Sequence, residues 1–77
     1  MSFIELNIEF DLGNIKLDVI DDFDVVAIKY LIALAFGVAY KTLVVEHNGR
    51  VLENTANIAA SGIKHGDTIV IFEEWNQ

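Results

Sequence analysis

A regular alternation of apolar and polar residues near the start of the chain constrains its fold most strongly. The apolar positions of two successive runs are Ile4, Leu6, Ile8 and Phe10, and then Ile15, Leu17 and Val19. Because successive side chains of a strand point to opposite faces, each run predicts a strand with one buried face. Gly13 lies between the runs and can take the positive φ that a tight turn needs. The two runs therefore predict an antiparallel hairpin.

One helix is predicted after this hairpin, over residues 24–36. Asp21, Asp22 and Asp24 stand at its start, where acidic side chains can cap free backbone N–H groups. Gly37 follows it and can adopt the left-handed conformation that ends a helix. At about 100° per residue, one face of this helix is apolar, and we expect it to pack on a sheet. The residues of that face are Val25, Ile28, Leu31, Ile32, Ala35 and Phe36.

A second hairpin is predicted around Asn48-Gly49, because Asn-Gly between two apolar runs is a strong hairpin signal. Its strands are residues 42–46 and 51–52, and a last strand is predicted over residues 68–72. Two hairpins separated by one helix, in ββαββ order, indicate the α+β class with the helix across one face of a mixed sheet. We assign residues 1–72 to this domain and residues 73–77 to a short tail.

Composition and charge limit the classes of function. The chain has 77 residues, of which 53% are hydrophobic, as expected of one small domain with a dense core. Its formal net charge of −7 disfavours nucleic acid and anionic membranes as partners and favours a protein with a basic surface. The alternative is that the charge only keeps an apolar chain soluble. Without cysteine there is neither a disulfide nor a thiolate ligand for zinc.

The apolar segments of the chain are too short or too interrupted for targeting or membrane insertion. Glu5, Glu9 and Asp11 break up the apolar residues near the start, so no secretory signal is predicted. Residues 30–40, the most apolar stretch, are shorter than the ~20 residues that a membrane span requires. We expect a cytoplasmic protein.

The spacing of the apolar positions resembles that of the ubiquitin family along nearly the whole chain. The matching positions are Ile4, Leu6, Ile15, Leu17, Val25, Ile28, Ile32, Leu43, Val45, Leu52, Ile58, Ile63, Ile69 and Ile71, with Gly37 at the end of the helix. Residues 60–71 are similar to the last loop and strand of many β-grasp proteins. The resemblance implies the ubiquitin-like β-grasp fold and the binding of partner proteins. Because a fold does not fix a function, the site is considered separately.

The resemblance also implies a binding patch on the outward side of the sheet. By alternation, Val44, Val70 and Phe72 point away from the helix, and they match the hydrophobic recognition patch of ubiquitin. We expect them to form one apolar surface, with Glu5 and Glu46 at its rim. Contiguous exposed apolar surface is uncommon without a use. The alternative is that these residues only reflect the strand propensity of Val and Phe.

The outer side of the predicted helix is a second candidate surface. It carries one charge, Lys29, whereas a surface helix normally has a polar stripe. Val26, Tyr30 and Leu34 on this side could dock a partner or form a homo-oligomer. The alternative is an alanine-rich helix that tolerates exposure to water.

The tail is a third candidate. Modifiers of the ubiquitin type end in a diglycine, whereas this chain ends in Glu73, Glu74, Trp75, Asn76 and Gln77. The tail nevertheless extends about as far past the last strand as that of a modifier. The alternative is a frayed end whose Trp75 packs back onto the sheet.

The sequence offers little for catalysis. His47 is predicted in a hairpin turn and His65 in a loop, where solvated histidines are common, and neither has a second ligand at metal spacing. No glycine-rich phosphate loop and no nucleophile motif occurs. We therefore expect no catalytic residue, no metal site and no cofactor.

These observations favour a non-catalytic ubiquitin-like protein that acts as an accessory or adaptor protein in a bacterial-type system. Residues 28–34 and the Gly-Ile-x-x-Gly-Asp loop at residues 62–67 are similar to the YukD-type accessory proteins of type VII secretion. Two alternatives stay open. One is a divergent bacterial protein modifier whose tail lacks diglycine or is processed. The other is a non-catalytic ubiquitin-like subunit of a multicomponent oxygenase, whose end resembles residues 61–74.

Overall fold

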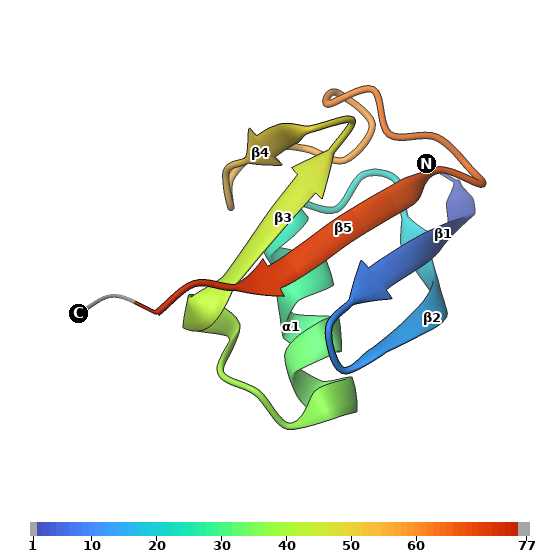
Figure 1. Ribbon diagram of the computed structural model, residues 1–77. Coiled ribbons are helices and arrows are strands. Elements are labelled where there is room, and N and C mark those ends of the chain that lie inside the picture. The colour runs from blue at the N-terminus through green and yellow to red at the C-terminus, as the bar shows by residue number, and fades with distance from the viewer. Residues whose placement is uncertain (1, 76–77) are drawn as a thin grey trace.

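The computed structural model describes residues 2–75, in which one α-helix crosses one face of a five-stranded sheet (Figure 1). The strands are β1 (Phe3–Phe10), β2 (Gly13–Ile20), β3 (Leu43–His47), β4 (Arg50–Leu52) and β5 (Thr68–Glu73). The helix is α1 (Val25–Phe36), and a short 3-10 helix, η1 (Tyr40–Thr42), precedes β3. The predicted α+β arrangement is confirmed.

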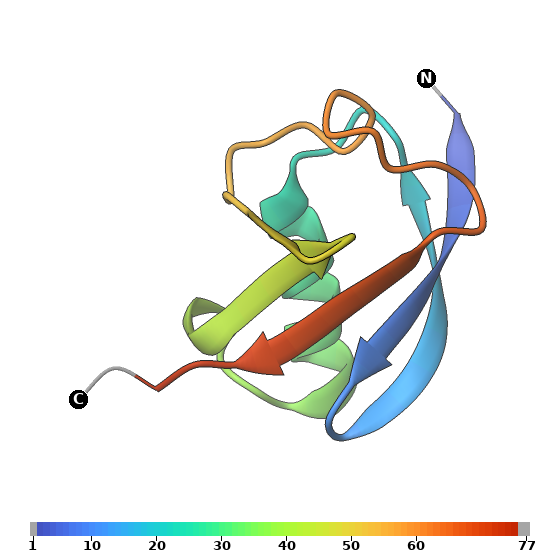
Figure 2. The ribbon, with the colours of Figure 1, turned by 45° about the horizontal axis from the view of Figure 1, so that its top comes forward.

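The first and last strands of the chain lie side by side in the middle of the sheet, whose order is β2-β1-β5-β3-β4. β1 and β5 run parallel, with Asn7 opposite Thr68 and Phe10 opposite Ile71. The other neighbouring strands are antiparallel. Figure 2 shows α1 behind this sheet, so the opposite face of the sheet is left without a covering helix.

The core lies between α1 and the sheet. Its fully buried large side chains are Leu6, Ile8, Val19, Val25, Ile28, Ile32, Leu43, Val45, Ile58, Ile69 and Ile71. The strand residues in this set alternate along β1, β3 and β5, as their sequence pattern predicts, because alternate side chains share one face. Ile58 and Ile63 come from the long loop between β4 and β5 and close one end of the core.

One residue of the predicted helix face is placed differently. Val25, Ile28 and Ile32 are buried, but Ala35, expected beside them, is exposed. A methyl group is too short to reach the sheet from the last turn of α1. Phe36 fills that space instead, and its ring centroid lies 5.1 Å from that of Phe10 in an edge-to-face arrangement.

The helix ends where the sequence predicts, but its start is capped differently. Gly37 has a φ of 71° and its N–H donates to the carbonyl of Ala33, as expected of a left-handed helix stop. At the start, the side chain of Asp24 makes no capping hydrogen bond, so this expectation was wrong. The first backbone N–H groups of α1 donate to the carbonyl oxygens of Ala56 and Asn54, at 2.8 and 3.1 Å. Main-chain groups of the β4–β5 loop therefore cap the helix.

The hairpin of β3 and β4 is closed by the predicted Asn-Gly turn. Asn48 and Gly49 both have positive φ, 53° and 77°, as a two-residue turn of this kind requires. The turn fixes the register, with His47 opposite Arg50 and Val45 opposite Leu52. In the described part of the chain, no helix is long and apolar enough to span a membrane.

Two alanine substitutions in α1 test the position of the core. Ile28→Ala removes a fully buried side chain and should lower the free energy of unfolding by about 2–5 kcal/mol. Leu34→Ala removes a side chain that is 83% exposed and should change it by less than about 0.5 kcal/mol. Urea unfolding followed by circular dichroism measures both values. Equal losses would contradict the helix orientation described above.

A candidate protein-binding surface on the open sheet face

The strand register places the three predicted patch residues next to one another. Val44 of β3 lies opposite Phe72 of β5, and Val70 follows two positions away on the same face of β5. Val70 is 39% exposed, while Val44 and Phe72 are half-buried. The inward neighbours of these residues, Val45 and Ile71, are buried in the core. We call Val44, Val70 and Phe72 the sheet patch.

Two carboxylates flank the middle of the sheet patch. Glu9 of β1 and Glu46 of β3 both lie opposite Val70, one on each side of it. Neighbouring positions on adjacent strands hold their side chains about 5 Å apart on one face. An apolar side chain between two acidic ones is therefore the central feature of this surface.

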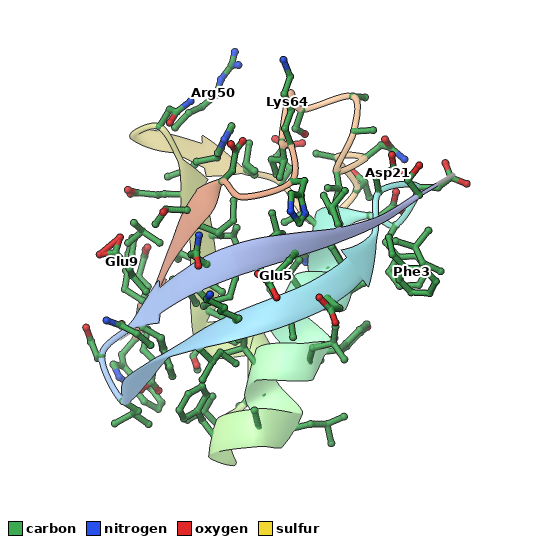
Figure 3. All side chains as sticks on the ribbon, turned by 90° about the vertical axis from the view of Figure 1, so that its right-hand side faces the viewer. Phe3, Glu5, Glu9, Asp21, Arg50 and Lys64 are labelled. Atoms are coloured by element: carbon green, nitrogen blue, oxygen red, sulfur yellow. The ribbon has the colours of Figure 1, made fainter. Side chains whose placement is uncertain are left out.

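Glu5, which was expected at the rim of the sheet patch, lies elsewhere. Pairing of β1 with β5 begins only at Asn7, two residues after Glu5. Glu5 therefore lies next to the loop that precedes β5. Its backbone N–H donates to Nδ1 of His65 at 3.0 Å, and its carbonyl accepts from Gly66. Figure 3 shows Glu5 and Glu9 well apart along β1. Glu9 thus takes the place that the sequence analysis gave to Glu5.

The open face also contains an apolar residue that the sequence analysis missed. Val51 of β4 lies opposite Glu46, on the side away from β5, and is 58% exposed. It extends the apolar surface beyond Glu46 toward the edge of the sheet. Alternation from the buried Leu52 could have revealed it, because adjacent residues of a strand point to opposite faces.

The predicted outer face of the helix lies on the other side of the molecule. Val26, Tyr30 and Leu34 are spaced by four residues and so line one side of α1. Leu34 is 83% exposed and Tyr30 48%, whereas Val26 is half-buried. The ring centroids of Tyr30 and Tyr40 lie 4.6 Å apart, and the neighbouring phenol group of Tyr40 raises the pKa of Tyr30. Self-association or docking through this face stays a prediction.

His47 is buried, although the sequence analysis expected a solvated histidine in a turn. It is the last residue of β3, is 8% exposed, and its Nε2 lies 2.9 Å from Oδ2 of Asp67. The same carboxylate oxygen accepts the backbone N–H of Lys64 at 2.9 Å. These contacts tie the end of β3 to the loop that leads into β5. Within residues 2–75 there is no group of three or more His, Cys, Asp or Glu side chains that could hold a metal ion.

The described part of the tail leaves the sheet without packing on it. β5 runs to Glu73, one residue further than predicted, and the backbone N–H of Glu74 donates to the carbonyl of Thr42 at 2.6 Å. Trp75 is 68% exposed, so the alternative in which it packs back onto the sheet does not hold. Asn76 and Gln77, the rest of the predicted tail, lie outside the described residues.

Comparison with solved structures identifies the fold. Ubiquitin from Caldiarchaeum subterraneum superposes with a TM-score of 0.87 at 19% identity, over 97% of this chain and 98% of that one. The ubiquitin-like domain of Dsk2 from Plasmodium falciparum gives 0.87 at 14% identity, over 94% and 99% of the two chains. A structure of ATBAG1 in complex with HSP70 gives 0.86 at 14% identity, over 92% of this chain and 40% of that one.

Comparison of the sequence with protein families and with curated proteins identifies no relative. No family model matches the chain, and no curated protein matches it either. The structural similarity, at less than 20% identity, establishes the fold. The chain has the ubiquitin-like β-grasp fold that its apolar spacing predicts.

The contact between His47 and Asp67 makes a prediction about stability in acid. The backbone N–H of Lys64 lowers the pKa of Asp67, and His47 lowers it further. A lowered pKa in the folded state stabilises the protein above the unfolded value, about 3.9, and this contribution is lost as the pH falls through the lower folded value. Asp67→Asn should therefore have a smaller free energy of unfolding than the wild type at pH 7 and lose less of it below about pH 4.

Denaturant unfolding at a series of pH values between 2 and 7 measures this difference. Asp11→Asn serves as a control, because it removes a carboxylate from the exposed turn between β1 and β2. Parallel pH curves for the wild type and Asp67→Asn would show that the contact contributes nothing to acid sensitivity.

Proposed function

We propose that this chain is a non-catalytic ubiquitin-like protein that binds a partner protein through the sheet patch. The proposal rests on one observation: Val70 lies exposed between Glu9 and Glu46, with Phe72 and Val44 beside it on the same face. An apolar anchor that loses water on binding supplies affinity, and charges around it set orientation and partner choice.

The charge of the surface indicates the chemistry of the partner. Glu9 and Glu46 would repel an acidic surface and attract Lys or Arg side chains placed on both sides of an apolar residue. The formal net charge of −7 acts in the same direction at long range, because it speeds the encounter with a basic protein. We therefore propose a partner that presents an apolar side chain flanked by basic residues.

We also propose a setting for this binding function. The similarity of residues 28–34 and 62–67 to YukD-type proteins supports an accessory or adaptor role in a bacterial-type system, and the composition supports a cytoplasmic location. A similar fold also occurs within the structure of ATBAG1 in complex with HSP70, and that assembly of two proteins supports the proposal of a protein partner here.

Substitutions on the two candidate surfaces test the proposal. Val70→Asp places a third carboxylate between Glu9 and Glu46 and should reduce capture of the partner at least tenfold, because it removes the apolar anchor and adds repulsion. Leu34→Asp, the matched control on the exposed side of α1, should leave capture unchanged. The measurement is affinity capture from the host with quantitative mass spectrometry, followed by titration of the purified partner. Circular dichroism checks that both variants are folded.

The flanking charges give a second readout in the same titration. Glu9→Lys and Glu46→Lys should each weaken binding and reduce its dependence on salt, because screening acts on charged contacts. Capture that is lost with Leu34→Asp and kept with Val70→Asp would move the binding site to the helix. Capture that is insensitive to both variants would remove both surfaces from the proposal.

A protein modifier is the second candidate, favoured by the chain that continues past β5. Glu74 and Trp75 are exposed and lead away from the sheet, as a tail that enters an enzyme would. The superposition with ubiquitin from Caldiarchaeum subterraneum also covers 98% of that ubiquitin chain. The sequence has no diglycine, so conjugation would need a different or processed end.

Mass spectrometry of the protein recovered from its host tests this alternative. A modifier should appear as a shortened chain, or in covalent conjugates that survive denaturing electrophoresis. Recovery of only the unprocessed chain, under growth conditions in which the partner of the sheet patch is captured, would exclude this candidate.

A further inference from the structure

The outer edge of β2 is a long strand edge that nothing in the described chain covers. β2 has eight residues, stands at the end of the sheet order, and pairs only with β1 among residues 2–75. Figure 3 shows the two strands side by side, with β2 at the border of the sheet. An edge of this length is a template for another strand unless it is blocked.

The hydrogen bonds of β1 show which backbone groups of β2 point outward. The N–H of Asn7 donates to Asp67, and the carbonyl of Glu5 accepts from Gly66, so the odd-numbered residues of β1 face β5. The even-numbered residues must then bond to their partners in β2, such as Leu17, which lies opposite Leu6.

The remaining residues of β2 therefore present their backbone groups to the free edge. These are the even-numbered positions Asn14, Lys16 and Asp18, whose N–H and C=O groups point away from β1, whereas the carbonyl of Ile20 already accepts the N–H of Phe23. A strand added at this edge would bond to these three residues.

The side chains of this edge are complementary to a reversed copy of themselves. If a second copy of β2 lies antiparallel with Leu17 opposite its own equivalent, Lys16 faces Asp18 of the second copy, and Asp18 faces Lys16. In the same register Ile15 faces Val19 of the second copy on the helix side of the sheet. Opposite charges directly across two antiparallel strands attract, and each such pair is counted twice in a twofold dimer.

We propose that two copies of the chain associate through β2 in this register, so that their sheets join into one. The backbone parity fits, because Lys16 and Asp18 would form hydrogen-bonded pairs, while the two Leu17 residues would form the closely spaced pair between them. This dimer rests on the edge of β2 and leaves the sheet patch free.

Two features of the β2 edge are unfavourable in the isolated chain: half-exposed apolar side chains and a pair of like charges. Ile15 and Leu17 pack against the core but stay half-exposed at the end of the sheet, and a second copy would cover them. On the open face, Glu5 and Asp18 lie directly opposite each other, an unfavourable pair of like charges. Lys16 of the second copy would stand on the other side of Asp18 and offset that repulsion.

The ion pair that Lys16 makes with Glu5 of its own chain would not prevent it from pairing with Asp18 of a second copy. The Nζ of Lys16 lies 3.9 Å from Oε1 of Glu5, and the two side chains are 71% and 45% exposed. Exposed ion pairs of this kind contribute little to stability, so the lysine can turn toward a second copy at low cost. A single pair of strand edges buries little area, and we expect a weak dimer.

Charge reversal tests the register directly. Lys16→Asp and Asp18→Lys should each convert both attractive pairs into repulsive ones and weaken self-association about tenfold or more. The double variant with both substitutions exchanges the two charges and should restore it. An equimolar mixture of the two single variants should form a one-to-one heterodimer, because one edge is then acidic and the other basic. Leu34→Lys is the control and should associate as the wild type does.

Sedimentation equilibrium over about 10 µM to about 1 mM protein gives the dissociation constants, in the range expected for a small interface. About 0.15 M salt limits the repulsion between two chains of charge −7. Backbone amide exchange gives a second readout, since the amides of Lys16 and Asp18 should gain protection as the protein concentration rises.

Each result of these experiments either supports or overturns the proposed dimer register. Restoration by the double variant, together with the heterodimer, supports the proposed register. A mass that stays at the 8.6 kDa monomer over the whole range overturns it. Self-association that is insensitive to both charge reversals also overturns it. Self-association that Leu34→Lys abolishes overturns it as well and would place the contact on the helix.

Discussion

The insertion of β5 between β1 and β3 is the contact on which the rest of the structure depends. β1 and β5 are separated by most of the chain, yet they pair in parallel at the centre of the sheet. Until β5 is in place, the two hairpins share no backbone hydrogen bonds with each other. Its inward residues, Ile69 and Ile71, complete the core, and Val70 between them reaches the opposite face. The core and the proposed binding surface are thus alternate positions of one strand.

This coupling explains why the open face can be both exposed and well positioned. Val70 and Phe72 stand on a strand whose other side is buried in the core through Ile69 and Ile71, and whose two neighbours set its register. A surface built in this way needs little ordering when a partner binds, which limits the entropic cost of association. The acidic residues beside Val70 belong to the same rigid sheet.

Local patterns were sufficient to predict most of the fold. Alternation in the first hairpin, the Asn48-Gly49 turn and the stop at Gly37 act over a few residues, and each is where the sequence analysis expected it. Alternation also assigned Val44, Val70 and Phe72 to one face, because the direction of a side chain depends on parity alone.

Several features that the sequence analysis missed depend on contacts between distant segments. Glu9 rather than Glu5 borders Val70 because the offset between the parallel strands β1 and β5 is set by the whole fold. His47 lies on the buried face of β3 with Leu43 and Val45, and its partner Asp67 comes from a distant loop. The exposure of Ala35 depends on how far the last turn of α1 lies from the sheet, which periodicity does not report.

Capping of α1 by the carbonyl groups of Asn54 and Ala56 has a consequence for divergence. A cap made by a side chain restricts its position to a few residue types, whereas a main-chain carbonyl is supplied by any amino acid. The start of this helix is therefore specified by the path of the backbone, and the residues around it are free to drift. Distant relatives can thus retain the same geometry after their recognisable sequence signals have been lost.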